Sequence, residues 1–426
     1  MTRPDPLRPV VHWVCPIPPA QTDIAHYTAR ILPALAQHAR VILWTDANRW
    51  DPSLAAYARI ERFDPDTLSP RDLSLAARRA GAPMAAPQAV FIHIGNAWVF
   101  HAGLIRLARR VPSIVVLHDL AIQEMLNDAM RNGLFPSETY RAEMADHYGE
   151  AGAQAAARVL NEPGYAHQLA PDMPGFQLAL PRAVSALAHT PAAVAALQAY
   201  GRVPVHHLEL PFQPGRAPDI RRPNTGPLRF LQFGYIGPNR RLFEIIAALG
   251  EVKDRVDFRF DVMGHVWDRA AFRTVVAQAG LEDRVHLRGF VPEARLDAEL
   301  RLAHLVFNLR YPTLGEASGS QLRIWNAGAA AVVHDAGWYS TLPEDTVFRI
   351  PNDLDQEKDA LKALVLDLAQ DRSRITPLQI AGRAQLDRHH HPQDYARAIA
   401  GLARAAGAEA AQMLERRALQ RAGLGA

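Results

Sequence analysis

The sequence lacks several features that would place a protein in a special class. It has a single cysteine, Cys15, which excludes a disulfide framework and is typical of a reducing compartment. It contains no run of about 18 apolar residues, so we expect no membrane span, and its polar, proline-rich start predicts neither a signal peptide nor an anchor. Only three residues are lysines, and no basic stripe is interleaved with aromatics, so we expect no nucleic-acid partner.

The composition that remains is that of an ordinary globular protein. A length of 426 residues exceeds what one core usually serves, which predicts two domains. Short apolar runs alternate with segments of helical periodicity, beginning with a strand at 10–14 and a helix near 24–35. This order of strand, loop, helix and strand is typical of parallel doubly wound sheets, so we predict an α/β fold.

One proline-rich segment, residues 211–227, is almost free of apolar periodicity and is predicted to be a linker. We predict an N-terminal Rossmann-like domain at 1–210 and a C-terminal domain at 228–391. Residues 121–181 form a helical insertion in the first domain, either a lid or acceptor wall or a helical cover over the core. The alanine-rich tail at 392–426 is predicted to be helical.

The strongest functional pattern lies in the stretch 308–328. A polar loop follows the apolar run 305–307, and helical spacing then resumes. The first backbone N–H groups of such a helix have no intrahelical partner, and the helix dipole favours a phosphate there. These amides belong to Ser318, Gly319 and Ser320.

Glu316 precedes those amides, where its charge would repel a phosphate placed directly on it. Its expected partners are therefore hydroxyl groups, and sugar hydroxyls beside a diphosphate describe a nucleotide sugar. In the alternative interpretation, Ser318 only caps the helix and Glu316 is a solvated loop acid.

The motifs around this loop are Arg310-Tyr311-Pro312, Gly315-Glu316, Ser318-Gly319-Ser320, Ala327-Gly328 and Asp335-Ala336-Gly337-Trp338. Together they resemble the donor-site segment of the GT4 family of retaining glycosyltransferases. The resemblance implies the GT-B fold, with two facing Rossmann-like doubly wound domains, a cleft between them and a C-terminal helix that crosses back to the first domain. It also implies transfer of a sugar from a nucleoside diphosphate sugar, as co-substrate, to an acceptor hydroxyl, with no metal and no other cofactor.

The resemblance assigns catalytic roles to His118 and Glu316. His118 ends the predicted strand 113–117 and can donate a hydrogen bond to a sugar or phosphate. The polar residues expected near the acceptor or the cleft are Asp23, Asn96 and Asp119. Asp23 and Asp119 have an alternative role as helix caps.

The donor diphosphate is assigned to Ser318, Gly319, Ser320, Arg240 and Arg323. Arginine suits the task because its fork bonds two phosphate oxygens and stays charged. A salt-bridge role for Arg323 is equally compatible with the sequence. The nucleotide is assigned to Gly234, Gly264 and Val291, where a glycine such as Gly264 lets the backbone come close to a base or ribose.

The sequence departs from the family pattern at three positions. Ile324 stands where the family usually has a second glutamate that holds the nucleotide ribose, a glutamate that a subgroup of GT4-like sequences also lacks. Tyr235 replaces an arginine, and Asp23 stands where glycine is common. These departures favour a competing hypothesis, a catalytically inactive GT-B scaffold that binds a nucleotide or a partner enzyme. A sugar nucleotide epimerase is a third hypothesis.

Family analogy predicts a saccharide or lipid-linked saccharide acceptor in the assembly of a cell-envelope or other surface glycan. We therefore expect a cytoplasmic protein that can associate peripherally with the inner face of the membrane. The histidine run 389–391 cannot place three rings on one helix face, so we predict no metal site there.

Overall fold

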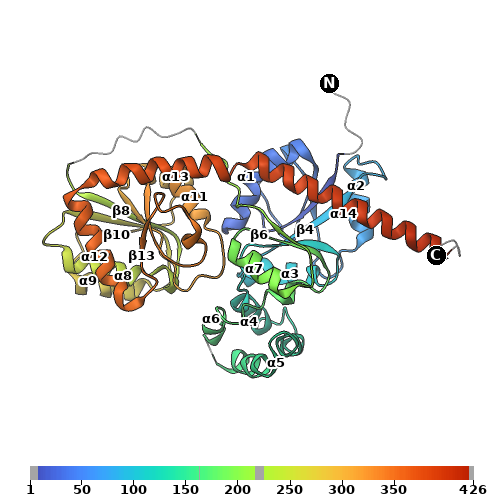
Figure 1. The fold of residues 1–426 in the computed structure, drawn as a ribbon, viewed down its shortest axis with the longest axis horizontal. Helices are drawn as coiled ribbons and strands as arrows, with labels where there is room; N and C mark the ends of the chain where they lie inside the picture. The colour runs from blue at the N-terminus through green and yellow to red at the C-terminus, as the bar shows by residue number, and fades with distance from the viewer. Residues whose placement is uncertain (1–7, 163, 216–224, 422–426) are drawn as a thin grey trace. The chain divides into compact units, whose positions relative to one another are not determined.

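The computed structural model describes residues 8–162, 164–215 and 225–421, with only the backbone of 409–421 (Figure 1). The chain folds into two compact units. Unit 1 comprises residues 1–213, 314–317 and 392–426, and unit 2 comprises residues 214–313 and 318–391. Most of the predicted linker, residues 216–224, lies outside the described part of the chain.

Unit 1 contains a seven-stranded parallel sheet in the order β3-β2-β1-β4-β5-β6-β7. Its strands are β1 (Val10–Val14), β2 (Arg40–Thr45), β3 (Arg59–Arg62), β4 (Gln88–Ile94), β5 (Ser113–Leu117), β6 (Ala183–Ala188) and β7 (Val205–His207). Its helices are α1 (Asp23–His38), α2 (Pro70–Arg79), α3 (Trp98–Ala108), α4 (Gln123–Arg131), α5 (Ser137–Asn161), α6 (Tyr165–Leu169), α7 (Pro191–Tyr200) and α14 (Pro392–Arg421).

Unit 2 contains a six-stranded parallel sheet in the order β10-β9-β8-β11-β12-β13. Its strands are β8 (Leu228–Ile236), β9 (Phe258–Val266), β10 (Val285–Gly289), β11 (Leu305–Phe307), β12 (Ala330–His334) and β13 (Phe348–Ile350). Its helices are α8 (Leu242–Val252), α9 (Arg269–Ala279), α10 (Glu293–Leu302), α11 (Gly319–Asn326), α12 (Leu354–Gln370) and α13 (Ile375–His389).

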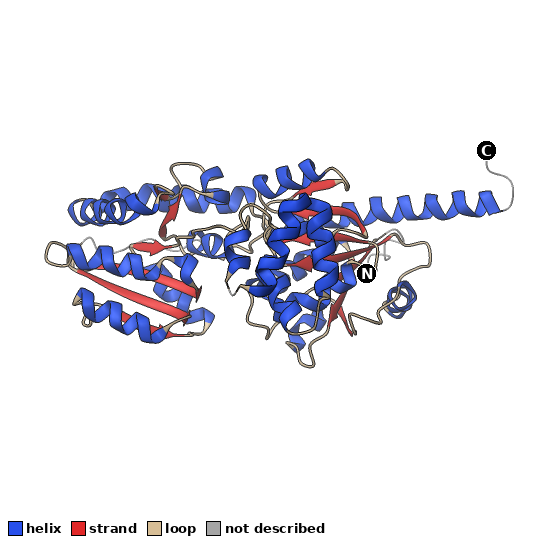
Figure 2. Cartoon of the chain, turned by 90° about the horizontal axis from the view of Figure 1, so that it is seen from below, coloured by secondary structure: helices blue, strands red, loops and turns tan. Residues whose placement is uncertain are grey.

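Both sheets reverse their strand order at the first strand, β1 in unit 1 and β8 in unit 2. This arrangement is the doubly wound topology, in which helices cover both faces of a sheet and ligands bind at the carboxyl ends of the strands. Figure 2 shows the strands of each unit in red between helices in blue. The buried strands are rich in Val, Ile, Leu and Ala because both faces of a parallel sheet pack against helices.

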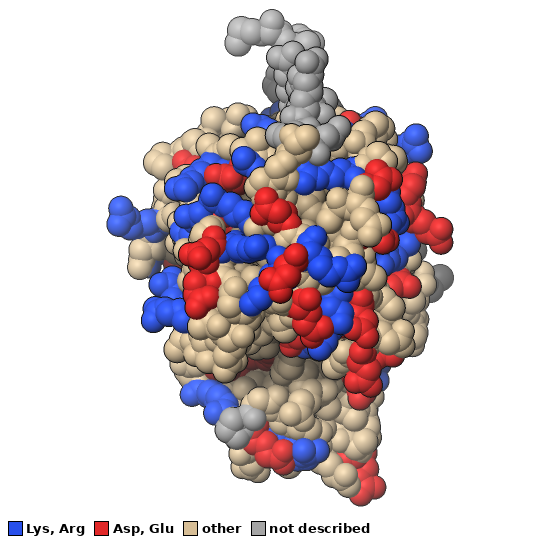
Figure 3. All heavy atoms as spheres, turned by 90° about the vertical axis from the view of Figure 1, so that its left-hand side faces the viewer, with Lys and Arg blue, Asp and Glu red and all other residues tan. Residues whose placement is uncertain are grey.

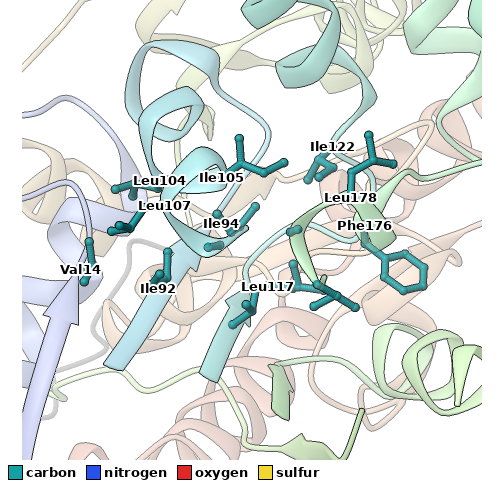
Figure 4. Packing of buried hydrophobic residues seen from close by; sticks show 14 of the residues in the cluster. Val14, Ile92, Ile94, Leu104, Ile105, Leu107, Leu117, Ile122, Phe176 and Leu178 are labelled. Atoms are coloured by element: carbon teal, nitrogen blue, oxygen red, sulfur yellow. The ribbon is translucent and has the colours of Figure 1, made fainter. Parts of the chain in front are cut away.

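The core of unit 1 explains the helical insertion. In Figure 4, Ile105 of α3 and Ile94 of β4 pack in the same cluster as Phe176 and Leu178, which come from the insertion. Tyr140 and Met144 of α5 are also fully buried in this cluster. The insertion therefore covers the core with these side chains. Its long helix is interrupted at Gly149, where φ is 64°.

The last helix, α14, packs on α1 and β4 within unit 1. The hydroxyl groups of Tyr27 on α1 and Tyr395 on α14 lie 2.6 Å apart and are buried. Farther along the helix, Gly407 approaches Pro87 so closely that a Cβ there would lie 2.6 Å from the proline ring. The first half of α14 is thus part of the core of unit 1.

Candidate functional site

The predicted residues of unit 1 gather at the carboxyl edge of its sheet. Strands β4 and β5 pair in register, with Ile94 opposite Leu117, so the residues that follow each strand meet at one edge. The His118 amide donates to the Ile94 carbonyl at 2.9 Å, which brings His118 beside Gly95 and Asn96. His118 and Asn96, both assigned to the site from the sequence, thus lie at one sheet edge.

Asn96 and Asp119 hold the loops of this edge in place. The Asp119 carboxylate accepts a hydrogen bond from the Asn96 amide at 2.7 Å. The Asn96 side chain donates to Glu124 at 2.8 Å and accepts from the Met125 amide at 2.9 Å. Asn96 thereby fixes the first turn of α4. Asp119 does not cap that helix with these contacts, and both side chains have structural tasks whether or not they meet an acceptor.

His118 belongs to a cluster of histidines that the sequence pattern did not reveal. Its Nε2 lies 2.9 Å from Nδ1 of His93, and its ring centroid lies 5.1 Å from that of His189. Loss of hydration on burial, followed by the influence of His189, His93 and His101, holds the pKa of His118 well below its ordinary value. His118 is therefore neutral at pH 7, and it can act as a hydrogen-bond donor or acceptor but not as a cation.

The loop that contains Glu316 is held on unit 1 by backbone hydrogen bonds. The amides of Leu120 and Ala121 both donate to the carbonyl of Leu314 at 2.9 Å. The Thr190 hydroxyl donates to the Gly315 carbonyl at 3.0 Å. Gly315 has φ of +78°, and a Cβ there would lie 2.6 Å from Leu120, so only glycine fits. The loop is fixed beside His118, because His118 lies only two residues before Leu120.

Glu316 itself is a buried acid. It is 8% exposed, and its carboxylate accepts a hydrogen bond from the Leu314 amide at 2.7 Å. The alternative interpretation of Glu316 as a solvated loop acid is therefore wrong. A buried carboxylate accepts several hydrogen bonds and favours donors such as the hydroxyl groups of a sugar.

Two residues farther on, α11 begins in unit 2 with its cap in place. The Ser318 hydroxyl accepts from the Gln321 amide at 3.1 Å, as the capping alternative predicted. Asn308 supports this arrangement from the end of β11 by donating to Gln321 at 2.9 Å. A Cβ added at Gly319 would meet no atom within 4 Å, so the space beside the first backbone amides of α11 is open. The capped helix end can still present these amides to an anion.

The carboxyl ends of β8, β9 and β10 are lined by glycines and exposed aromatic rings. Tyr235 and Phe290 are 72% and 75% exposed and directly follow Gly234 and Gly289. Both of these glycines have positive φ and open space at their Cβ positions. Gly264 differs, because its Cβ position lies only 1.9 Å from the carbonyl oxygen of Gly234. The neighbouring strand, rather than an open space, therefore requires glycine at this position.

Val291, the third residue assigned to the nucleotide, lies two residues after the end of β10, and its side chain is buried. Its backbone groups lie at the same sheet edge as Gly289.

The two arginines after β8 have different surroundings. Arg240 is 4% exposed, and its Nη2 donates to the Phe233 carbonyl at 3.3 Å, while its own carbonyl accepts from Gln232. Arg241 has the only positive φ among the described non-glycine residues, at 56°, and its Nε lies 3.0 Å from Glu357. The charge of Arg240 lies in the interior of unit 2 at the end of β8, whereas Arg241 is held in a buried ion pair.

A buried polar network near this edge was not predicted. His334, at the end of β12, lies 3.1 Å from Glu357 through Nε2 and 3.0 Å from the Arg310 carbonyl through Nδ1. It thus connects the loop after β11 with the Arg241–Glu357 pair. The three side chains lie far apart in the sequence, so no local pattern could have brought them together.

Arg323 and Ile324 point into unit 2. The Arg323 guanidinium pairs with Glu293 at 2.9 Å and with Asp297 at 2.8 Å, both on α10. It therefore has the salt-bridge role that was the alternative to phosphate binding. Ile324 is 0% exposed and belongs to the packed face of α11. Asp23 is exposed in the first turn of α1, and Thr22 occupies the cap position without a side-chain bond.

The surface has no single-sign character in the view of Figure 3, where Lys and Arg side chains are interspersed with Asp and Glu. None of the helices in the described ranges combines the length and apolar character that crossing a bilayer requires. In the same ranges, no three His, Cys, Asp or Glu side chains are arranged to hold a metal ion.

No protein-family profile matches the chain. The amylovoran biosynthesis glycosyltransferase AmsK of Erwinia amylovora is 27% identical over 168 residues. This match covers 38% of the present chain and 40% of AmsK, so the chain spans less than half the length of this curated relative.

Solved structures that resemble nearly the whole chain include the following two. HepE of Anabaena, in complex with UDP, has a TM-score of 0.58 at 15% identity and covers 92% of this chain and 99% of its own. Sucrose-phosphate synthase of Thermosynechococcus elongatus has a TM-score of 0.60 at 13% identity and covers 94% of this chain and 100% of its own. The chain thus has the GT-B fold of two parallel-sheet Rossmann-like domains, and the predicted fold class is confirmed.

Proposed function

We propose that this chain is a glycosyltransferase that moves a sugar from a nucleoside diphosphate sugar to an acceptor hydroxyl with retention of anomeric configuration. The observation that carries the proposal is the buried carboxylate of Glu316 two residues before the capped and open start of α11. An acid that favours hydroxyl partners and a helix end that favours phosphate are thus joined by a few bonds of backbone. A nucleoside diphosphate sugar offers both groups in the same order.

The fold supports the choice of donor. HepE, which shares the fold, was solved with UDP, and AmsK is named as a glycosyltransferase of amylovoran biosynthesis. We assign the nucleotide to the carboxyl ends of β8, β9 and β10, where Gly234 and Gly289 leave open space. The assembly of a surface or cell-envelope glycan, with a saccharide or lipid-linked saccharide as acceptor, is the role we propose by analogy with AmsK.

In the proposed reaction, the bond from the anomeric carbon to the diphosphate oxygen breaks, and a bond to the acceptor oxygen forms on the same face of the sugar. The proton of the acceptor hydroxyl passes to the departing diphosphate. The departing diphosphate gains negative charge, which the amides of Ser318, Gly319 and Ser320 stabilise together with the positive end of α11. Arg240 adds a buried positive charge on the same unit. Glu316 holds sugar hydroxyls, and neutral His118 donates a hydrogen bond to the sugar or phosphate. The proposed reaction needs no metal.

A scaffold that binds a nucleotide without turnover is the second candidate. The observation that favours it is the burial of Ile324, which puts an apolar side chain where related enzymes carry a ribose-binding glutamate. A scaffold has no requirement for a buried acid before an anion-binding helix end, so Glu316 favours the enzyme.

The test is a panel of UDP-, GDP-, ADP- and dTDP-sugars with release of the free nucleotide as readout. We expect the wild type to turn over one donor, and Glu316→Ala and Arg240→Ala to lose at least about tenfold in kcat/KM, about 1.4 kcal/mol. Glu251→Ala is the control, because this exposed acid pairs with Lys358 and Lys362 on the surface of unit 2. If no donor is turned over with any acceptor but one nucleotide protects the protein against thermal unfolding, the scaffold replaces the enzyme.

A further inference from the structure

We propose that His93 is a positioning residue that fixes the ring proton of His118 on Nδ1, so that His118 presents an N–H group as a donor to the ligand. The role of His118 toward a donor sugar rests on the function proposed above, but the position of its proton does not. His93 lies in β4 behind His118 and has no exposed surface. It belongs to no motif of the proposed site.

The geometry leaves two ways to share a proton between the rings. Nδ1 of His93 and Nε2 of His118 lie 2.9 Å apart, so one of the two nitrogens donates and the other accepts. If His118 donates, the proton of neutral His93 must lie on Nε2. If His93 donates, the proton of neutral His118 must lie on Nδ1. The hydrogen bond at one ring nitrogen decides which form the other ring takes.

The surroundings of His93 decide between these forms. Nε2 of His93 is buried and has no hydrogen-bond partner among the described residues. A proton there would be a buried donor without an acceptor, and such N–H groups are rare because their desolvation is not compensated. The form in which His93 carries its proton on Nδ1 and donates to His118 avoids this cost.

Two further histidines keep the cluster in this arrangement. His101 Nδ1 lies 3.1 Å from the His93 carbonyl, and His189 Nδ1 lies 2.9 Å from the Leu208 carbonyl. A carbonyl can only accept, so both rings carry a proton on Nδ1. Their Nε2 atoms then carry a lone pair and no hydrogen, so they cannot donate to His118 or His93.

Aromatic rings hold the pair in position. The Tyr27 ring contacts the His118 ring edge-on, with the ring centroids 4.9 Å apart. The ring centroids of Trp13 and His93 lie 4.2 Å apart. Tyr27 is fixed in turn by its hydroxyl contact with Tyr395.

Burial lowers the pKa of His101 and His189 to about 4, and that of His93 well below its ordinary value. All four rings are neutral at pH 7, so each has one proton whose place is defined.

The test reads the tautomer directly from the full chain without ligand. Protein labelled with nitrogen-15 in histidine is studied by long-range proton–nitrogen NMR, and the His118 signals are assigned with His118→Gln. We expect the His118 proton on Nδ1 in the wild type. In His93→Asn an amide N–H can occupy the place of Nδ1 and keep this form, whereas His93→Leu removes the donor and shifts His118 toward the other tautomer.

The control is His12→Leu, the same change at another buried histidine of the same sheet, which contacts Trp44 and Gln88 instead. With the donor found in the panel above, we expect kcat/KM to fall about tenfold in His93→Leu. It should stay within about threefold in His93→Asn and His12→Leu, because neither change removes the donor to His118.

A wild-type His118 proton on Nε2 would overturn the proposal, whether or not any sugar is transferred. A tautomer shift in His93→Leu without loss of transfer in an active enzyme would overturn the link to the ligand. Absence of transfer in the wild type would contradict the proposed function and leave the tautomer result to decide this inference. If His93→Leu fails to fold, the wild-type and His93→Asn spectra still decide it.

Discussion

The carboxyl edges of the two sheets present different chemistry. In unit 1 the edge is lined by neutral imidazole rings, among them the half-buried His118 and the fully buried His93, and by one buried acid, Glu316. In unit 2 the edge has glycines with open space, two exposed aromatic rings and the start of α11. The first edge can orient hydroxyl groups through fixed hydrogen bonds, and the second can stabilise a phosphate through backbone amides.

This contrast indicates how the proposed reaction would divide its electrostatic tasks. In that reaction charge would develop on the departing diphosphate, and the amides of α11, if the diphosphate binds there as proposed, would need no reorganisation. A cationic histidine near the sugar would attract the anion away from this place. The low pKa of His118 keeps its ring uncharged at pH 7. The following predictions test whether the two edges differ in this way.

The largest expected effect is a loss of stability in unit 1 at pH 5. His12, His101 and His189 have pKa values of about 4 in the folded protein against about 6.5 in the unfolded chain. Between these values the unfolded chain binds more protons than the folded protein. As far as these histidines are concerned, the free energy of unfolding is therefore highest above about pH 6.5 and decreases as the pH drops toward 4. From pH 7.5 to 5 we expect a loss of about 2 kcal/mol for each histidine.

Urea unfolding at the two pH values measures this loss, and hydrogen exchange corrected for intrinsic rates locates it. The amides of β4, β5 and β6 should lose protection before those of β8, β9 and β12. Equal loss of protection in both sheets would contradict the contrast between the units. His12→Gln should remove about 2 kcal/mol of the pH effect, the share of one histidine, while His93 and His118, whose pKa values are also lowered, continue to contribute.

The second prediction concerns Ile324, the position where the GT4 pattern described in the sequence analysis has a glutamate. Ile324 is fully buried on the packed face of α11. We expect Ile324→Glu to lower the free energy of unfolding by at least about 3 kcal/mol, because a carboxylate would enter the core without a partner. Ile324→Val, the control, should cost about 1 kcal/mol.

Urea unfolding and nucleotide titration decide this prediction together. A stable Ile324→Glu protein with tighter nucleotide binding would show that residue 324 faces the ribose, and the contrast between a packed helix face and an open helix start would fail.

The third prediction separates stability from binding at the start of α11. Gly319 has open space at its Cβ position, and an acid in the first turn interacts well with the helix dipole. Gly319→Asp should therefore raise the free energy of unfolding by about 0.5 kcal/mol. It should weaken nucleotide binding about 100-fold, because its carboxylate would face the diphosphate. Calorimetric titration with the nucleotide identified in the donor panel measures the second effect.

The control is Gly319→Ala, which adds a Cβ in the same open space without charge. It should stabilise the helix by about 0.5–1 kcal/mol and weaken binding much less than the acid does. If both variants bind the nucleotide as the wild type does, the diphosphate lies elsewhere.

The sequence predicted the parts of this structure that depend on local pattern. The strand of Val10–Val14 has its predicted bounds, because an uninterrupted apolar run is a local signal. The capping role of Ser318 follows from residue type in the same way. The resemblance named the GT-B fold, which the similar structures confirm.

The remaining features depend on contacts between distant segments. Glu316 became a buried acid because Leu120, Ala121 and Thr190 hold its loop, and these residues lie more than a hundred positions away. Gly264 is required by the carbonyl of Gly234 in the neighbouring strand. The histidine cluster forms because β4, β5 and β6 end together, and a single sequence gives no register between strands.

The smallest expected effect is at Arg323. Its replacement tests whether this arginine only forms ion pairs within unit 2 or also binds the donor diphosphate. Its guanidinium is 9% exposed and pairs with Glu293 and Asp297 of α10. Arg323→Met should keep much of the side-chain packing but remove the two ion pairs. We expect a loss of about 1 kcal/mol in the free energy of unfolding, because both carboxylates can return to water.

Nucleotide affinity should change less than about twofold in Arg323→Met, since an arginine held by two acids offers little charge to a phosphate. Asp297→Asn is the matched control, because it weakens the same ion pair from the other side and should give a similar loss of stability. A tenfold loss of affinity in Arg323→Met but not in Asp297→Asn would place Arg323 on the diphosphate. In that case the anion site of unit 2 would extend a full turn into α11 and would not be confined to its open first amides.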